Sequence, residues 1–169
     1  MQSYDIYVSY ETDKLMCFIG KKTIHTTGGA QVTKFYISPS YLSYSQYMDL
    51  IQTGRDFGWR PTWVWPQESF LVDAQIEQQL AAGAFNGIAQ ADIFITVLPG
   101  TPSTNIEIGI AYPLCEDLLL VANDPVHFTQ TGLPDAHLSV LPSIKRVCCT
   151  VDEIPALLKT EYLYLIEKD

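Results

Sequence analysis

The chain has 169 residues, of which 47% are apolar and 17% charged, and its formal net charge is −9 at pH 7. Such a length and composition suit a globular domain with a sizeable core, and the negative charge disfavours a general nucleic-acid surface, which needs clustered Lys and Arg. No apolar run is long enough to span a membrane and the first residues lack a basic region followed by a hydrophobic one, so we predict a cytoplasmic protein that binds neither membranes nor nucleic acids.

Residues 1–31 precede the part of the chain that follows an α/β pattern. Apolar and polar residues alternate over Tyr4–Tyr10, and the segments 15–19 and 22–26 flank a Gly–Lys turn. Alternation of this kind is typical of strands, so we predict a β-hairpin or a small antiparallel ribbon. The first segment also resembles the opening strand of a TIR domain, but no amphipathic helix follows it. We therefore interpret 1–31 as an N-terminal β extension that covers a sheet edge or an oligomer interface, and 32–169 as the α/β domain.

From residue 32 onward, strand-like and helix-like segments alternate. Short apolar runs rich in branched and aromatic residues predict strands at 32–38, 59–66, 91–98, 118–122 and 144–151. Helical spacing predicts helices from Ser43 or Ser45 to Gly54 or Gly58, at 70–90, at 105–114, and after Asp152. This order predicts an open parallel sheet with helices on both faces, of the flavodoxin or Rossmann type.

Several side chains have a predicted structural role. The buried stripes of the helices at 70–90 and 105–114 are expected to consist of Ile76, Leu80, Phe85 and Ile88, and of Ile106, Ile110 and Leu114. Trp63 and Trp65 are expected to pack between the second strand and a helix, and Asp92 is expected to be structural because it begins its strand. The long segment 123–142 predicts a functional or interface role.

The cysteines and histidines give no sign of a metal site. Cys148 and Cys149 are adjacent, which is a poor spacing for zinc, and they lie in an apolar run that predicts buried thiols. The histidines are not at helical metal-binding spacing from other ligands; they are His25, His127 and His137. We predict no metal ion and no cofactor.

The stretch Asn86–Leu114 carries the clearest functional signal. The buried strand at 91–98 is followed by a turn-rich loop and then by a helix with Glu107 expected in its first turn. In open α/β sheets, ligands bind beyond the carboxyl ends of the strands, which is where Glu107 is expected. The helix dipole alone also favours an acid in a first turn, so the position by itself leaves a structural role open.

The same stretch resembles the signature of the nucleoside 2-deoxyribosyltransferase family. The similarity consists of an Asn–Gly–Ile helix end, an Ala–Asp–hydrophobic strand, and Glu107 followed by Ile108, Gly109 and Ala111. The resemblance covers roughly 32–122. It implies that Glu107 is the nucleophile that attacks the anomeric carbon of the sugar, and that Tyr36 orients it, although Tyr36 is equally compatible with a core aromatic.

Two positions differ from the family pattern. Ala84 or its neighbour stands where many transferases carry an aspartate that contacts the base, and Thr101 stands where another acid often precedes the glutamate. These differences favour hydrolysis, a different base, or binding without turnover.

Cleavage of an N-glycosidic bond passes through an oxocarbenium-like state. It needs a well-held carboxylate, a proton donor near the base and an aromatic or apolar wall. The candidate catalytic residues are Glu107 and Tyr36. The candidate substrate-binding residues follow the first strand or begin the helix that bears Glu107; they are Ser38, Tyr41, Leu42, Ser103, Thr104 and Asn105. The last three would suit hydroxyl or phosphate oxygens at a helix N-terminus, or would simply cap the helix.

The function predicted from these residues is cleavage or transfer at the N-glycosidic bond of a nucleoside or nucleotide, as in a 2-deoxyribosyltransferase or a nucleoside hydrolase. Two alternatives stay open. One is TIR-like cleavage of NAD, which also uses a glutamate on a helix, and the other is a nucleotide-binding module without turnover. A homo-oligomer is predicted from the extension at 1–31, the aromatic-rich helix at 41–53 and the family's habit of completing its sites from a neighbouring subunit.

Overall fold

The structure is a computed structural model, and it describes residues 5–11, 14–20, 32–39, 41–67, 74–129 and 144–162. The chain divides into two compact units, 1–31 and 32–169. In the first unit, β1 (Asp5–Glu11) and β2 (Lys14–Gly20) pair antiparallel, which confirms an N-terminal hairpin. The predicted turn at Gly20 is wrong, because Gly20 lies in β2 and pairs with Asp5. The strand predicted at 22–26 lies outside the described residues.

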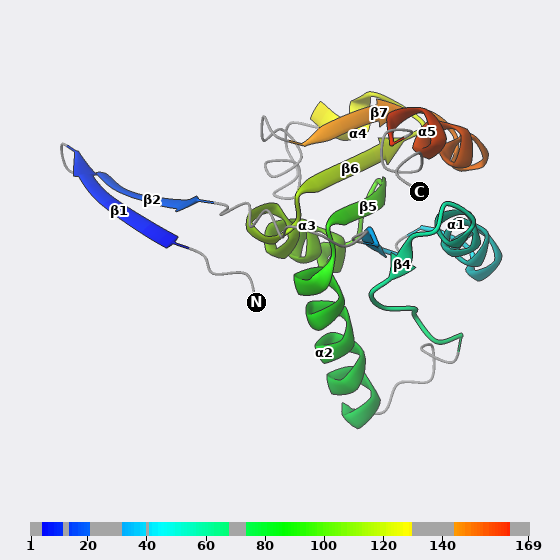
Figure 1. Ribbon diagram of the computed structural model, residues 1–169, viewed down its shortest axis with the longest axis horizontal. Helices are drawn as coiled ribbons and strands as arrows, with labels where there is room; N and C mark the ends of the chain where they lie inside the picture. Colours follow the sequence, from blue (N-terminus) through cyan, green and yellow to red (C-terminus); the bar gives the residue numbers. More distant parts are fainter. Residues whose placement is uncertain are drawn as a thin grey trace. The chain divides into compact units, whose positions relative to one another are not determined.

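The second unit is built on a five-stranded parallel sheet, which confirms the predicted fold class (Figure 1). The strands are β3 (Lys34–Ile37), β4 (Arg60–Pro61), β5 (Ile93–Leu98), β6 (Asp117–Ala122) and β7 (Lys145–Cys148). The helices are α1 (Tyr44–Asp56), α2 (Ala74–Gln90), α3 (Pro102–Leu114), α4 (Val126–Thr129) and α5 (Ile154–Glu161), with the 3-10 turn η2 (Val151–Glu153) before α5. None of the helices in the described ranges is long and apolar enough to cross a membrane.

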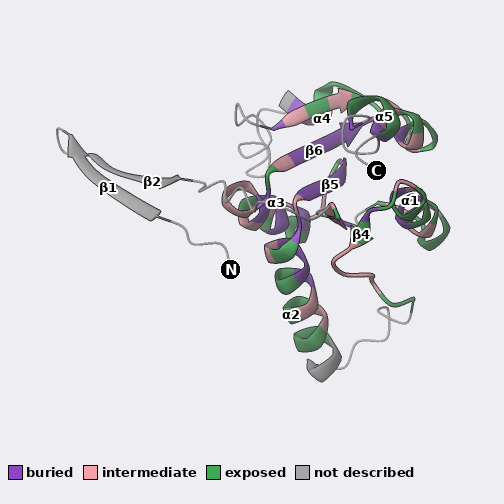
Figure 2. Ribbon diagram, viewed as in Figure 1, coloured by how far each residue is buried: buried purple, intermediate pink, exposed green. Residues whose placement is uncertain are grey.

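Two apolar layers hold the helices to the sheet, because successive side chains of a strand point to opposite faces. Phe35 and Ile37 of β3 pack on the face covered by α1 and α5, whereas Tyr36 packs on the face covered by α2 and α3 (Figure 1). All six residues of β5 are buried, and Figure 2 shows the central strands as the most buried part of the unit. The sequence of a strand that is covered on both faces is a nearly continuous apolar run, as in β5.

The strand order creates a crevice beside β3. The order across the sheet is β4-β3-β5-β6-β7, so the chain runs from β3 outward to β4 and then crosses back to β5 on the other side of β3. Such a reversal separates the connections that leave two neighbouring strands, and ligands bind in the resulting crevice at their carboxyl ends. Tyr36 lies in β3, and Glu107 follows β5 in α3.

The second core strand is much shorter than the predicted 59–66. Only Arg60 and Pro61 pair with β3, at the edge of the sheet. Proline has no N–H to donate, which limits it to edge strands and strand ends. The chain makes one more backbone hydrogen bond to β3, from Thr62 N to Phe35 O at 2.9 Å, and then leaves the sheet. The residues after it are therefore free to form a wall of the crevice.

Helix α3 begins nearly one turn earlier than predicted. Thr101 is its N-cap, and Thr101 and Thr104 cap each other: Thr104 N donates to Thr101 Oγ1 at 3.3 Å, and Thr101 N donates to Thr104 Oγ1 at 3.0 Å. Glu107 consequently lies in the second turn. The predicted apolar face is also wrong, because Ile106 is 65% exposed, whereas Glu107 and Ile108 face inward.

Helix α1 shows how a glycine can be misinterpreted. Ser43 caps the helix in a reciprocal box with Gln46, and Gly58, with φ +76°, lies just beyond its end. Gly54, predicted to mark the end, lies inside α1, where a Cβ would come within 2.4 Å of Phe35 Cζ. The glycine therefore permits close packing of α1 on the sheet.

Three further expectations about burial are wrong. Phe85 of α2 is 52% exposed and Ala84 is buried instead, whereas Ile88 is buried as predicted. Cys148 is exposed and Cys149 is partly exposed, because β7 is an edge strand whose side chains are incompletely covered.

Candidate active site

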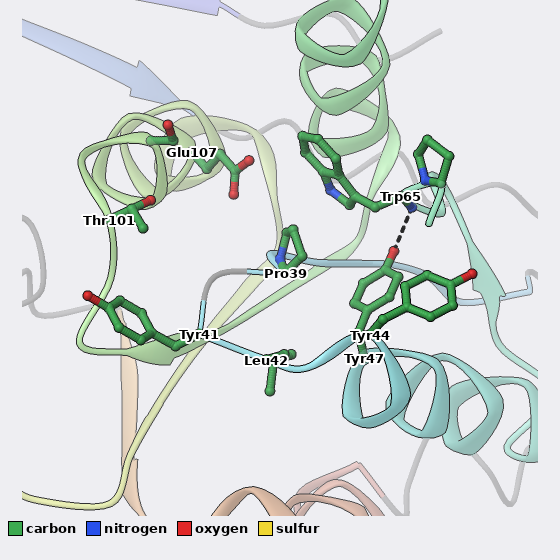
Figure 3. Close-up of a pocket in the computed structure, with 10 residues that line it drawn as sticks. Pro39, Tyr41, Leu42, Tyr44, Tyr47, Trp65, Thr101 and Glu107 are labelled. Atoms are coloured by element: carbon green, nitrogen blue, oxygen red, sulfur yellow. Dashed lines mark hydrogen bonds between the residues drawn. The ribbon is translucent and has the colours of Figure 1, made fainter. Parts of the chain in front are cut away.

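A pocket of about 360 Å³ opens at the carboxyl ends of β3 and β5, within the size range of small-molecule sites. Its walls come from the segments that follow β3, β4 and β5, as Figure 3 shows. The lining residues are Pro39, Tyr41, Leu42, Tyr44, Tyr47, Trp65, Pro66, Thr101, Ser103 and Glu107. Glu107 is the one charged side chain among them, and aromatic rings form much of the rest.

Tyr36 and Glu107, which are 71 positions apart in sequence, are in contact, although Glu107 lines the pocket and Tyr36 does not. Tyr36 Oη donates a hydrogen bond to Glu107 Oε1 at 3.1 Å. The Tyr36 ring is fully buried and stacks on Phe94, with ring centroids 5.7 Å apart. On α2, a Cβ at Gly87 would lie 3.0 Å from Tyr36 Cδ2, so the helix also packs closely on this ring. The hydroxyl is therefore held in one position by its surroundings.

Glu107 as a residue is 9% exposed, and two opposing effects act on the pKa of its carboxyl group. Burial raises its pKa, while hydrogen bonds from Ser38 and Tyr36 oppose that rise by favouring the ionised form. Its second oxygen, Oε2, is buried and has no hydrogen-bond partner among the described residues. One oxygen is thus held by the protein, while the other lacks a donor that a ligand can supply.

The Tyr36 hydroxyl donates a hydrogen bond to Glu107 and keeps its proton. Burial and the neighbouring charge of Glu107 raise the pKa of Tyr36, so the phenol keeps its proton over the physiological range. A neutral phenol can orient the carboxylate without adding a second negative charge to the pocket.

Trp65 packs against both apolar layers, and in addition it extends this network, which the sequence interpretation did not foresee. Its indole Nε1 donates to Tyr36 Oη at 3.1 Å, and its backbone N donates to Tyr47 Oη at 3.0 Å (Figure 3). Burial raises the pKa of Tyr47 to about 12, so this phenol also stays neutral. Pro61 was the available signal: a proline within a predicted strand indicates that the strand ends early, which releases Trp65 from the sheet.

Trp63 does pack as predicted. A Cβ on Gly83 of α2 would lie 2.3 Å from Trp63 Cη2, and a Cβ on Gly87 would lie 2.6 Å from Trp63 Cβ. Ala84, at the position where the transferases carry an acid, is buried and does not line the pocket. Asp92 is structural as predicted, since its Oδ2 accepts a hydrogen bond from Lys34 N at 2.7 Å.

The segment after β3 supplies the outer wall of the pocket. Tyr41 and Leu42 both line it, and Tyr41 is 66% exposed. Tyr41 also has φ 60°, a left-handed conformation that a bulky residue adopts rarely and that is often found at functional sites. Ser38 does not line the pocket; it is buried, and its hydrogen bond to Glu107 lowers the pKa of that carboxyl group.

Of the three candidate residues at the start of α3, only Ser103 lines the pocket. Ser103 is exposed and lines the pocket. Thr104 is buried in its reciprocal cap with Thr101, and Asn105 Nδ2 donates to Thr101 O at 3.4 Å, so neither lines the pocket. Thr101, which caps the helix, lines the pocket as well. The described residues contain no cluster of three or more His, Cys, Asp or Glu side chains that could hold a metal ion.

Comparison with known proteins identifies the fold but no family. No family model matches the sequence, and no curated protein matches it. Among solved structures, the CMP N-glycosidase BcmB of Clostridium botulinum is similar, with a TM-score of 0.52 and 18% sequence identity. The match covers 75% of this chain and 99% of that chain. The chain thus has the α/β fold of this N-glycosidase.

Proposed function

We propose that this protein cleaves the N-glycosidic bond of a nucleoside or nucleotide, with Glu107 as the nucleophile. The observation that carries the proposal is a buried carboxylate in a pocket walled by aromatic rings. Tyr36 holds its Oε1, and Oε2 has no hydrogen-bond partner in the part of the chain that the structure describes. The resemblance of the Glu107 motif to the 2-deoxyribosyltransferases supports it. The fold similarity to a CMP N-glycosidase supports the same class of bond.

The reaction would use the two carboxylate oxygens differently. Tyr36 holds Oε1, while Oε2 attacks the anomeric carbon as the bond to the base breaks and its electron pair leaves with the base. The departing base takes a proton from water or from a hydroxyl of the pocket. The sugar is then bound to Glu107 as an ester, and water or a second base attacks the anomeric carbon, loses a proton to the solvent and releases the carboxylate. The first acceptor gives hydrolysis, and the second gives transfer.

The rest of the pocket suits the other parts of such a substrate. The rings of Tyr41, Tyr44 and Trp65 offer faces on which a base can stack. The hydroxyl groups of Thr101 and Ser103, on the α3 side, can hydrogen-bond to the sugar or to a 5′-phosphate. We propose hydrolysis over transfer, because neither Ala84 nor Thr101 carries the acid that many transferases have at these positions.

Incubation with a panel of nucleosides, nucleotides and NAD tests the proposal, with released base measured by chromatography. Glu107→Gln should abolish release, because an amide is a poor nucleophile. Glu116→Gln is the matched control, since Glu116 is exposed and does not line the pocket. Equal release by the parent and Glu107→Gln would refute the role of Glu107.

Two other results would replace the proposal by one of its alternatives. Release of nicotinamide from NAD alone would indicate a TIR-like NAD glycohydrolase. Binding of nucleotides, detected by calorimetry without any base release, would indicate a binding module.

A further inference from the structure

We propose that Trp65 is a positioning residue, which holds the Tyr36 hydroxyl in the direction that serves Glu107. The inference rests on the proposed function in taking Glu107 as the reacting group. Its structural basis is a continuous chain of hydrogen bonds from the Trp65 indole, through Tyr36 Oη, to Glu107 Oε1, each 3.1 Å long.

The direction of this chain follows from the chemistry of its members. An indole N–H can only donate, a carboxylate can only accept, and a phenol has one proton to donate. Tyr36 Oη therefore accepts from Trp65 and has its single proton left for Glu107. Hydrogen bonds in such a chain polarise one another, so the bond from Trp65 makes Tyr36 a stronger donor. In agreement, the hydrogen bond from Trp65 lowers the pKa of Tyr36 against the larger effect of burial.

Trp65 is itself held at two points. The indole is bound to Tyr36 of β3, and the backbone N is bound to Tyr47 of α1, whose ring is buried. The side chain also lines the pocket, as Figure 3 shows. The residue on which a ligand can stack is therefore the same one that is bound to the group orienting the nucleophile.

Trp63 provides a matched control on the same segment. It is also a tryptophan beside the sheet; its ring packs on Gly83 of α2, and its Cβ lies close to Gly87. Its Nε1 is buried and has no hydrogen-bond partner among the described residues. Trp63→Phe therefore removes an indole and some packing, as Trp65→Phe does, but leaves the chain from Trp65 to Glu107 in place.

The test is a pH titration of the Glu107 carboxyl carbon by NMR, in protein labelled with 13C-glutamate and assigned through the loss of its signal in Glu107→Gln. In Trp65→Phe the midpoint should rise by about 0.3–1 pH unit, because a weaker donor at Oε1 stabilises the carboxylate less. Trp63→Phe should leave the midpoint unchanged. An unchanged midpoint in Trp65→Phe, or an equal rise in Trp63→Phe, would overturn the proposal.

A second variant controls for the loss of packing that Trp65→Phe also causes. Replacing the Trp65 indole by the benzothiophene ring of 3-benzothienylalanine keeps the shape of the side chain and removes the N–H, so the same rise is expected. The titration needs no turnover, and its outcome is therefore independent of whether base release is found. If base release is found, the acid limb of kcat/KM should move by the same amount, and kcat should fall more than KM changes.

Discussion

Replacing Glu107 by glutamine should stabilise the protein at neutral and higher pH. In the folded chain this carboxyl is buried, its pKa is raised by that burial, and Oε2 lacks a partner among the described residues. Because an amide at this place would also lack a partner, the substitution removes only the added cost of burying the ionised form, which is about 1.4 kcal/mol for each pH unit by which the pKa is raised. In a protein of this size, each kcal/mol corresponds to about 2–4 °C in Tm. We therefore expect the neutral amide to raise Tm by several degrees at about pH 8.

The pH dependence gives this expectation a definite sign. Because burial raises the folded-state pKa of Glu107 above the unfolded value, the folded protein holds the proton more tightly, and the parent gains stability as pH falls through the folded-state pKa. The advantage of Glu107→Gln should therefore be complete above that pKa, shrink as pH falls through it, and vanish below the unfolded value of about 4.3.

Thermal unfolding followed by circular dichroism, from about pH 4 to pH 8, measures this difference. Glu116→Gln, on an exposed acid, should follow the parent at every pH. A Glu107→Gln protein that is less stable than the parent at about pH 8 would refute the reasoning. So would an advantage that persists unchanged at the acid end, because it could not arise from the buried charge.

Three further results are expected. Tyr36→Phe should lower kcat by about 5- to 150-fold with little change in KM, because the lost hydrogen bond to a charged acceptor contributes about 1–3 kcal/mol. Tyr112→Phe is the control, since Tyr112 does not line the pocket. An unchanged kcat for Tyr36→Phe would show that Tyr36 is only a core aromatic. Gly54→Ala should destabilise the fold by about 1–3 kcal/mol in chemical denaturation, since its Cβ would lie 2.4 Å from Phe35 Cζ; equal stability would show that α1 shifts without cost. Light scattering should give a mass above the 19.0 kDa of one chain, as expected for an oligomer that uses 1–31, and a monomer at micromolar concentration would contradict this.

Local patterns were sufficient to predict the α/β architecture. The apolar run of β5 is buried at every position, and the alternation of strands and helices corresponds to the parallel sheet. Element ends were less predictable. Helix α3 starts at a cap formed by two threonines, Thr101 and Thr104, instead of the more familiar box with a glutamate. The buried face of α3 was not predictable either: Ile106 is exposed while Glu107 and Ile108 are buried, because packing of the helix against the rest of the fold selects that face.

In the candidate site, too, some residues were predictable from the sequence and others were not. The sequence alone determined that an acid, Glu107, follows a buried strand, and the family resemblance suggested Tyr36 as its partner. Only the tertiary structure decided that Trp65 belongs with them, because this depends on β4 lying beside β3 and on the chain leaving the sheet after Pro61. Strand order and the path of an irregular segment are set by contacts between distant residues, and the spacing of apolar residues within a short window carries no information about such contacts.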